Sequence, residues 1–156
     1  MVVKLIAHRA NINGPSDSEN NPKQIDSCIE LGYDVEIDIR YDTLSQLFWL
    51  GHDKPQYQVS CEWIYNRKSY LWIHCKDITT LKKFIEYENS GYEYFWHQQD
   101  DFTLTSNNYI WTFPGKPYTN RSIIVMPESN TEISNLNTLR DVNCYGICTD
   151  YPSKLK

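Results

Sequence analysis

Short apolar runs along the chain end abruptly at polar residues with reactive or ligating side chains. The first run, residues 2–7, stops at His8 and Arg9, and five later runs end in a similar way. Runs of this length, separated by loops or helical stretches, indicate consecutive strands of a parallel sheet, either open or closed into a barrel. In β/α barrels the carboxyl ends of the strands meet on one face, where active sites lie. The pattern predicts one shared polar site, built from His8-Arg9, Glu36 with Asp38, His74 with Lys76, His97 with Asp100, Glu128 and Asp150.

Seven such runs are expected to form the core of the sheet, with residues 46–50 as a hairpin arm beside it. At 156 residues the chain has the size of one domain, so 1–156 is assigned to a single unit. A complete eight-stranded barrel needs about 200 residues or more, and the stretches 98–108 and 114–121 are too short or too irregular for crossover helices. The expected fold is α/β: a reduced TIM-type β/α barrel with about seven parallel strands, several outer helices missing and its closure left open. The strands are expected at 2–7, 33–40, 70–75, 93–97, 109–113, 122–126 and 145–149.

Two helices are predicted between these strands. Pro22 opens a segment with Ile25 and Cys28 at helical spacing, and Gly32 closes it. Asp77 is placed to cap the start of a second helix, directly after the third strand. Both helices follow the order that a parallel sheet requires.

Residues 33–40 alternate between apolar and polar side chains with the period of two that a strand gives. Glu36 and Asp38 therefore lie on one face, about 7 Å apart along the strand. If that face points into the mouth of a barrel, the two carboxylates converge; the alternative is an outward face in contact with solvent. Paired carboxylates are the hard oxygen ligands that Mg²⁺ and Ca²⁺ prefer.

Composition narrows the class of partner. The net charge of -5 and the scatter of Lys and Arg argue against nucleic acid as the main partner. No apolar run approaches the roughly 20 residues of a membrane span. The apolar segment at the amino terminus is too short for a signal peptide, because polar residues follow it almost at once. Five cysteines form no CxxC pair, which favours free thiols in a reducing compartment and hence a cytoplasmic protein. Nothing in the sequence indicates the oligomeric state.

Six motifs follow one another along the chain: His8-Arg9, Ser18-Glu19-Asn20-Asn21, Glu36-Ile-Asp38, His52-Asp53, Lys76 and Gly146-Ile-Cys-Thr-Asp-Tyr-Pro152. Their order resembles the signature of the glycerophosphodiester phosphodiesterase family, phosphodiesterases with a TIM-type barrel. The match covers the first half of the chain and the last ten residues, whereas residues 98–144 match weakly. The chain departs from the family in having Ala10 where Gly is usual, His74 where a third metal carboxylate is expected, and a much shorter length. It therefore resembles a short, divergent member.

The resemblance implies roles for the residues of these motifs. His8 and His52 would form the acid/base pair, with His8 as the base and His52 as the acid. An imidazole suits both tasks because its unperturbed pKa lies near neutrality. Arg9 would clamp a phosphate oxygen with its planar guanidinium, and Glu19 and Asn20 would support the site by organising the first loop or by contacting the metal.

A divalent cation is expected at Glu36 and Asp38, with His74 as the third ligand or, equally, as a donor of a hydrogen bond to substrate. Oxygen ligands favour Mg²⁺ or Ca²⁺, whereas an imidazole ligand would shift the preference toward Mn²⁺ or Zn²⁺. Lys76 would either pair with the substrate phosphate or hold the carboxylates in place.

The remaining wall of the mouth is expected from two segments that begin at His97 and Trp111. His97 would contact the substrate, and Trp111 would stack on a sugar or glycerol-like group. Packing in the core is the alternative for Trp111.

These residues together predict a metal-dependent phosphodiesterase that hydrolyses a small glycerol- or sugar-linked phosphodiester by histidine acid/base catalysis. One alternative is a reduced barrel that binds phosphate or sugar phosphate without turnover. Another is a transferase or lyase, in which an internal hydroxyl of the substrate attacks to give a cyclic phosphate.

Overall fold

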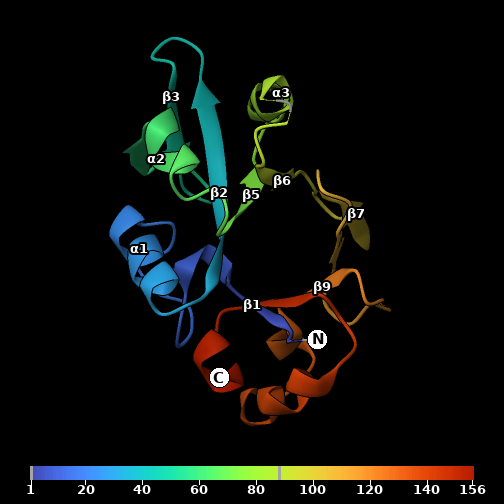
Figure 1. Cartoon of the computed structure of the whole chain (residues 1–156). Coiled ribbons are helices and arrows are strands. Elements are labelled where there is room, and N and C mark those ends of the chain that lie inside the picture. The colour runs from blue at the N-terminus through green and yellow to red at the C-terminus, as the bar shows by residue number, and fades with distance from the viewer. Residues whose placement is uncertain (1, 88) are drawn as a thin grey trace.

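The computed structural model describes residues 2–87 and 89–156, and in these residues ten strands form one curled, mostly parallel sheet (Figure 1). Seven strands pair in parallel, in the order β6-β5-β2-β1-β10-β9-β8. The expectation of a mixed α/β fold built on a partial, mostly parallel barrel is therefore confirmed. The seven strands are β1 (Lys4–Ala7), β2 (Asp34–Asp42), β5 (Leu71–Cys75), β6 (Glu93–Phe95), β8 (Ile110–Thr112), β9 (Ser122–Val125) and β10 (Gly146–Thr149).

Three antiparallel strands complete the sheet. The expected arm is a hairpin of β3 (Leu47–Leu50) and β4 (Tyr57–Val59), which pairs with the far end of β2. The third strand, β7 (Phe102–Leu104), pairs with β8 inside the stretch that we expected to be irregular. β4 and β7 have three residues each, too few for a recognisable period-two pattern.

The sheet curls until its two ends meet between β6 and the segment that follows β7 (Figure 1). There the backbone N–H of Ser106 donates to the carbonyl of Tyr94 over 2.9 Å, and the N–H of Tyr94 donates to Oγ of Ser106 over 3.0 Å. One of these hydrogen bonds joins two backbone groups and the other involves a side chain, so they are isolated bonds and not a continuous strand pairing. The partial barrel is therefore tied together at a point remote from β1 and β2.

The helical layer is unequal around the sheet. In the described residues the α-helices α1 (Pro22–Glu30), α2 (Cys61–Tyr65) and α3 (Ile78–Glu86) all precede β6, and the described residues after β6 form only 3-10 helices. The side chains of Asn21 and Asp77 cap α1 and α3, accepting backbone hydrogen bonds as Asx caps do. The connection from β8 to β9 is too short for a crossover helix, whereas the longer connection from β9 to β10 holds the 3-10 helices η2 (Pro127–Ser129) and η3 (Ile133–Asp141).

The alternation in β2 divides its side chains between two environments. Val35, Ile37 and Ile39 are fully buried in the cluster that contains residues of α1 and α3. Glu36 and Asp38 consequently face the opposite side, the interior of the curled sheet, where they are 2% and 1% exposed. The solvent-facing alternative for these two carboxylates is therefore wrong.

Two further observations concern the chain as a whole. None of the helices in residues 2–87 and 89–156 has the length and apolar character needed to cross a bilayer. All five cysteines are free, and four of them are buried.

Candidate metal and phosphate site

The site begins at the turn that ends β1. His8, Arg9 and Ala10 form one turn of 3-10 helix in which Arg9 and Ala10 have positive φ angles, 51° and 65°. This rare backbone lets the N–H of Arg9 donate to Oε2 of Glu36 over 3.1 Å. The turn therefore fixes the His-Arg pair against the carboxylates of β2.

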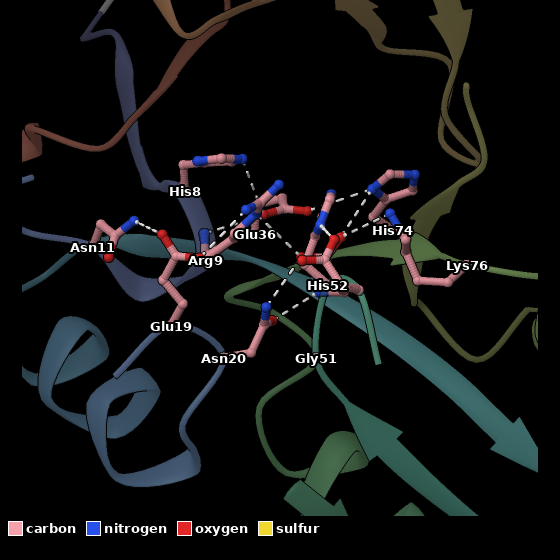
Figure 2. Close-up of polar contacts among 12 residues, drawn as sticks. His8, Arg9, Asn11, Glu19, Asn20, Glu36, Gly51, His52, His74 and Lys76 are labelled. Carbon is pink, nitrogen blue, oxygen red and sulfur yellow. Dashed lines mark hydrogen bonds and ion pairs between the residues drawn. The ribbon is translucent and has the colours of Figure 1, made fainter. Parts of the chain in front are cut away.

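Glu36, Asp38 and His74 form a buried group at the mouth of the curled sheet. One ligand atom of each lies within 4.8 Å of the others. Nδ1 of His74 is 3.2 Å from Oδ1 of Asp38 and 3.8 Å from Oε1 of Glu36. Figure 2 shows Glu36 between His8 and His74, with a contact to each. The residues proposed as metal ligands from the sequence therefore converge, in a geometry that could hold one cation.

Cations and an amide surround Asp38. Nε of Arg9 lies 3.4 Å from Oδ2, Nζ of Lys76 lies 3.3 Å from Oδ1, and the amide of Asn20 donates to Oδ2 over 3.0 Å. Burial alone would raise the pKa of Asp38, but the hydrogen bond from His74 and the charges of Lys76, His74 and Arg9 outweigh it and lower that pKa strongly. Asp38 is therefore anionic at neutral pH.

Glu36 responds differently to the same surroundings. Its burial, together with the negative charge of Asp38, raises its pKa above the usual value, and the charges of His8, His74 and Arg9 only oppose this rise. Two carboxylates in one pocket thus have their pKa values displaced in opposite directions, as like charges at close range require.

The first loop supports the site through its side chains. Asn20, at φ 59°, accepts from the backbone N–H of Asp38 over 2.9 Å in addition to donating to its carboxylate. Glu19 accepts from Nη1 of Arg9 over 3.3 Å and from the amide of Asn11 over 2.8 Å. Glu19 and Asn20 therefore hold Arg9 and Asp38 in place. Of the two roles expected for them, organising the loop or contacting the metal, this placement agrees with the first.

His8 is oriented from the last strand of the sheet. Its Nδ1 lies 2.8 Å from Oδ1 of Asp150, and its Nε2 lies 4.0 Å from Oε2 of Glu36. Burial disfavours the imidazolium, but the hydrogen bond to Asp150 and the charges of Glu36 and Asp150 outweigh it, so the pKa of His8 is raised. Glu128 in turn accepts from the backbone N–H of Asp150 and from the hydroxyl of Thr149, each over 2.8 Å.

Asp150 and Glu128 were predicted as polar strand ends, Glu128 as part of the rim and Asp150 also within the closing motif, but neither was given a catalytic or ligating role. The signal that could have assigned Asp150 is the position of the last strand. β10 is the parallel neighbour of β1, with Ala7 opposite Thr149, so the residues that follow both strands must meet.

His52 lies on the rim and is separate from the buried group. Its side chain is 37% exposed and its Nδ1 is 2.6 Å from Oδ1 of Asp53. The guanidinium of Arg40 donates to the carbonyls of Gly51 and His52 and so fixes the turn that carries the ring. With Arg9, His52 lines a polar cleft of about 250 Å³, whose other walls are Ser16, Asp17, Glu19, Asn20, Asp53, Lys54 and Gln56.

His97 and Trp111 each pack against neighbouring rings. The ring of His97 stacks on His74 with a centroid distance of 4.5 Å, and burial, together with the charges of His74 and Lys76, lowers its pKa to about 4. Trp111 is only 5% exposed and packs against Phe95 and Trp72 in the interior. This placement favours core packing for Trp111 over stacking on a substrate.

A separate apolar groove lies elsewhere, on the surface of β7, β8 and β9. It measures about 490 Å³ and its walls include Phe102, Leu104, Ile110 and Tyr118. None of its lining residues is a carboxylate, an imidazole or a lysine, so the groove is unsuited to the acid/base chemistry expected at the mouth.

Comparisons of the chain with protein-family models, with curated proteins and with solved structures give no match. The chemistry of the site must therefore be judged from its own geometry.

Proposed function

We propose that the chain is a metal-dependent phosphodiesterase acting on a small phosphodiester, built on a reduced TIM-type barrel. The observation that carries this proposal is the convergence of Glu36, Asp38 and His74 with His8 and Arg9 at one mouth. It joins a candidate cation site, a histidine paired with a carboxylate and a partly exposed guanidinium. The five free thiols further support a reducing, cytoplasmic location.

The donor set fits a divalent cation. Oε1 of Glu36, Oδ1 of Asp38 and Nδ1 of His74 face one another in a buried pocket. A divalent ion held by these three residues would supply positive charge to the non-bridging oxygens of a bound phosphodiester. Arg9, 23% exposed and lining the polar cleft, is placed to bind a second phosphate oxygen.

Hydrolysis also requires proton transfer at two positions. Asp150 holds the Nδ1 side of His8, so Nε2 is left as the atom that removes a proton from the attacking water. A new P–O bond then forms to that oxygen while the P–O bond to the alcohol breaks. His52, held on the cleft rim by Asp53, is placed to give a proton to the departing alkoxide.

The cleft between Arg9 and His52 suits a polar alcohol as leaving group. Its walls carry carboxylates, amides and a lysine, with no aliphatic side chain and no aromatic ring other than the imidazole of His52. Such a lining favours a hydroxylated group such as glycerol or a sugar, because hydroxyls can satisfy these donors and acceptors. A long acyl chain would gain nothing from burial there.

The test is a screen of metals against substrates on the purified chain. Glycerophosphodiesters and an aryl phosphodiester are incubated with Mg²⁺, Ca²⁺, Mn²⁺ or Zn²⁺, and the phosphorus products are followed by ³¹P NMR. A phosphomonoester that forms only with metal, and not with His8→Ala, supports the proposal. Binding without turnover would identify a phosphate-binding barrel instead, and a cyclic phosphate would identify a lyase or transferase.

A further inference from the structure

We infer that the metal site is built for Zn²⁺ or Mn²⁺ in preference to Mg²⁺ or Ca²⁺, and that His97 is a positioning residue for the nitrogen ligand, His74. The inference rests on the proposed metal-dependent function and specifies the ion. Three features carry it: the hydrogen bond at one ring nitrogen of His74, the atoms that face the other, and the rings parallel to it.

The two nitrogens of His74 have separate tasks. Nε2 lies 3.4 Å from the backbone carbonyl of His97, and a carbonyl can only accept a hydrogen bond. A hydrogen on Nε2 satisfies that carbonyl, and Nδ1 is the nitrogen that faces the carboxylates. In the metal-free protein Nδ1 hydrogen-bonds to Asp38, and a bound cation would replace that hydrogen. A histidine that ligates through one nitrogen and donates from the other to a carbonyl is the usual arrangement in metal sites.

Nδ1 of His74 shares its space with two carboxylate oxygens, at 3.2 Å and 3.8 Å. Either a cation or a second ring hydrogen must lie among these three electron-rich atoms. The pocket is secluded, since Glu36, Asp38 and His74 are 2%, 1% and 7% exposed. A metal ion is the occupant that all three donors can bind at once.

Parallel rings fix the plane of His74. Phe95 lies at a centroid distance of 5.2 Å with an interplanar angle of 11°, and His97 at 4.5 Å with 9°. Because one edge and the plane of the ring are both held, the lone pair of Nδ1 points in a predetermined direction. Such preorganisation reduces the freedom that the ligand must lose on binding.

A preset imidazole ligand decides between classes of ion. Mg²⁺ and Ca²⁺ take oxygen ligands, and Mg²⁺ gives up its water reluctantly. Imidazole suits Zn²⁺, and sites with mixed nitrogen and oxygen donors bind divalent transition metals in an order that puts Zn²⁺ above Mn²⁺. The site therefore discriminates through His74, whereas Glu36 and Asp38 serve any divalent cation.

The first experiment measures binding to the metal-stripped, full-length chain by calorimetry, with thermal denaturation in parallel. Cys61→Ser is the background, because Cys61 is the exposed thiol that could bind Zn²⁺ elsewhere. Zn²⁺ and Mn²⁺ are expected to bind at least about tenfold more tightly than Mg²⁺ or Ca²⁺. His74→Asp, which restores an all-oxygen site, is expected to weaken Zn²⁺ binding and strengthen that of Mg²⁺.

The outcomes separate the inference from the proposed function. Equal or tighter binding of Mg²⁺ by the wild type, or an unchanged preference in His74→Asp, overturns the inference and leaves a metal-dependent enzyme intact. Failure of all four ions to bind overturns both, and means that a ring hydrogen occupies the space between His74 and the carboxylates.

A second measurement does not depend on the folding of a variant. Pulsed EPR of bound Mn²⁺ is expected to show coupling to one imidazole nitrogen in the wild type; its absence overturns the inference. His97→Ala keeps the backbone carbonyl but removes the stacked ring, and is expected to weaken Zn²⁺ binding about tenfold. His97→Phe, which restores the ring, should recover it, and equal affinities in the two variants would reject the positioning role.

Discussion

The carboxylate of Asp150 lies 2.8 Å from Nδ1 of His8, although 142 positions separate the two residues in the chain. Parallel pairing of β10 with β1 brings them together, and Glu128 accepts a hydrogen bond from the backbone N–H of Asp150. A carboxylate on one ring nitrogen sets the tautomer of a histidine and leaves the other nitrogen free to accept a proton. The geometry therefore makes Asp150 the positioning partner of the proposed base.

Replacing Asp150 with Asn should lower kcat by about 100-fold, because the amide cannot stabilise the imidazolium that forms when His8 accepts a proton. Steady-state hydrolysis of a glycerophosphodiester measures the effect, and circular dichroism melting monitors the fold. Asp101→Asn is the matched control, since Asp101 is an exposed carboxylate paired with Lys116 at the surface. A decrease of equal size in both variants would contradict the assignment.

The same pair should give the metal-free protein a defined dependence of stability on pH. The pKa of His8 is raised, so its contribution is complete below the unfolded value of 6.5 and is lost as pH rises through the folded value. The pKa of Asp150 is lowered, against the effect of its burial, by the hydrogen bond and the charge of His8. Its contribution is therefore present above 3.8 and is lost as pH falls through the folded value.

The loss of unfolding free energy in Asp150→Asn, relative to wild type, should consequently be greatest between about pH 3.8 and pH 6.5. Urea unfolding with a chelator present, at about pH 5.5 and about pH 8.5, measures the difference from wild type. The difference is expected to shrink at the higher pH. A constant or growing difference would show that the pair adds no pH-dependent stability.

His52 can be tested through the leaving group. If His52 protonates the departing alkoxide, His52→Ala should reduce turnover of an alkyl phosphodiester by about 100-fold or more. A nitrophenyl ester, whose leaving group needs no proton, should be much less affected. His8→Ala should lose turnover by a similar factor with both substrates, because the attacking water must be activated in either reaction. Equal losses with both esters in His52→Ala would reject its role as the acid.

The period-two alternation of β2 predicted which side chains share a face, but it left open whether the polar face lies in the mouth or in solvent. Glu36 and Asp38 could be predicted to lie side by side because one strand carries both. The burial of Val35 and Ile37 on the opposite face confirms the predicted alternation. The order of parallel strands then predicted that the residues at their ends would meet.

Other parts of the site depend on pairings that no local pattern encodes. The contact of Asp150 with His8 requires the last strand to be the neighbour of the first. Trp111 has the same sequence signal whether its ring lies in the mouth or in the core, and only the neighbouring Trp72 and Phe95 decide it. His97 was expected to contact substrate, but its stacking on His74 depends on β5 and β6 being adjacent.

The raised pKa of Glu36 predicts how metal binding depends on pH. Burial and the charge of Asp38 favour the protonated acid, and a ligand must lose its proton to bind a cation. Apparent metal affinity should therefore rise with pH, with proton release detectable by calorimetry in two buffers of different ionisation enthalpy. Glu36→Gln should abolish stabilisation of the fold by metal, whereas Glu30→Gln, on the exposed face of α1, should retain it. Retained stabilisation in Glu36→Gln would exclude Glu36 as a ligand.

The turn before His52 offers a prediction about positioning. Gly51 has a φ of 142°, and a Cβ at this position would collide with the carbonyl oxygen of Lys54. Its N–H also donates to the carbonyl of Asp38 over 3.0 Å, which joins the turn to β2. Gly51→Ala should therefore displace His52 and lower kcat at least about tenfold, whereas metal affinity should change little.

Gly32→Ala is the matched control for that experiment. Gly32 follows α1 with a φ of 84°, and a Cβ there would meet nothing within 4 Å. The substitution should cost about 1 kcal/mol of unfolding free energy, because the left-handed backbone is strained for alanine, and it should leave kcat unchanged. Comparing the two variants separates backbone strain from displacement of the acid. If Gly51→Ala also lowers only stability, then the position of His52 does not limit turnover.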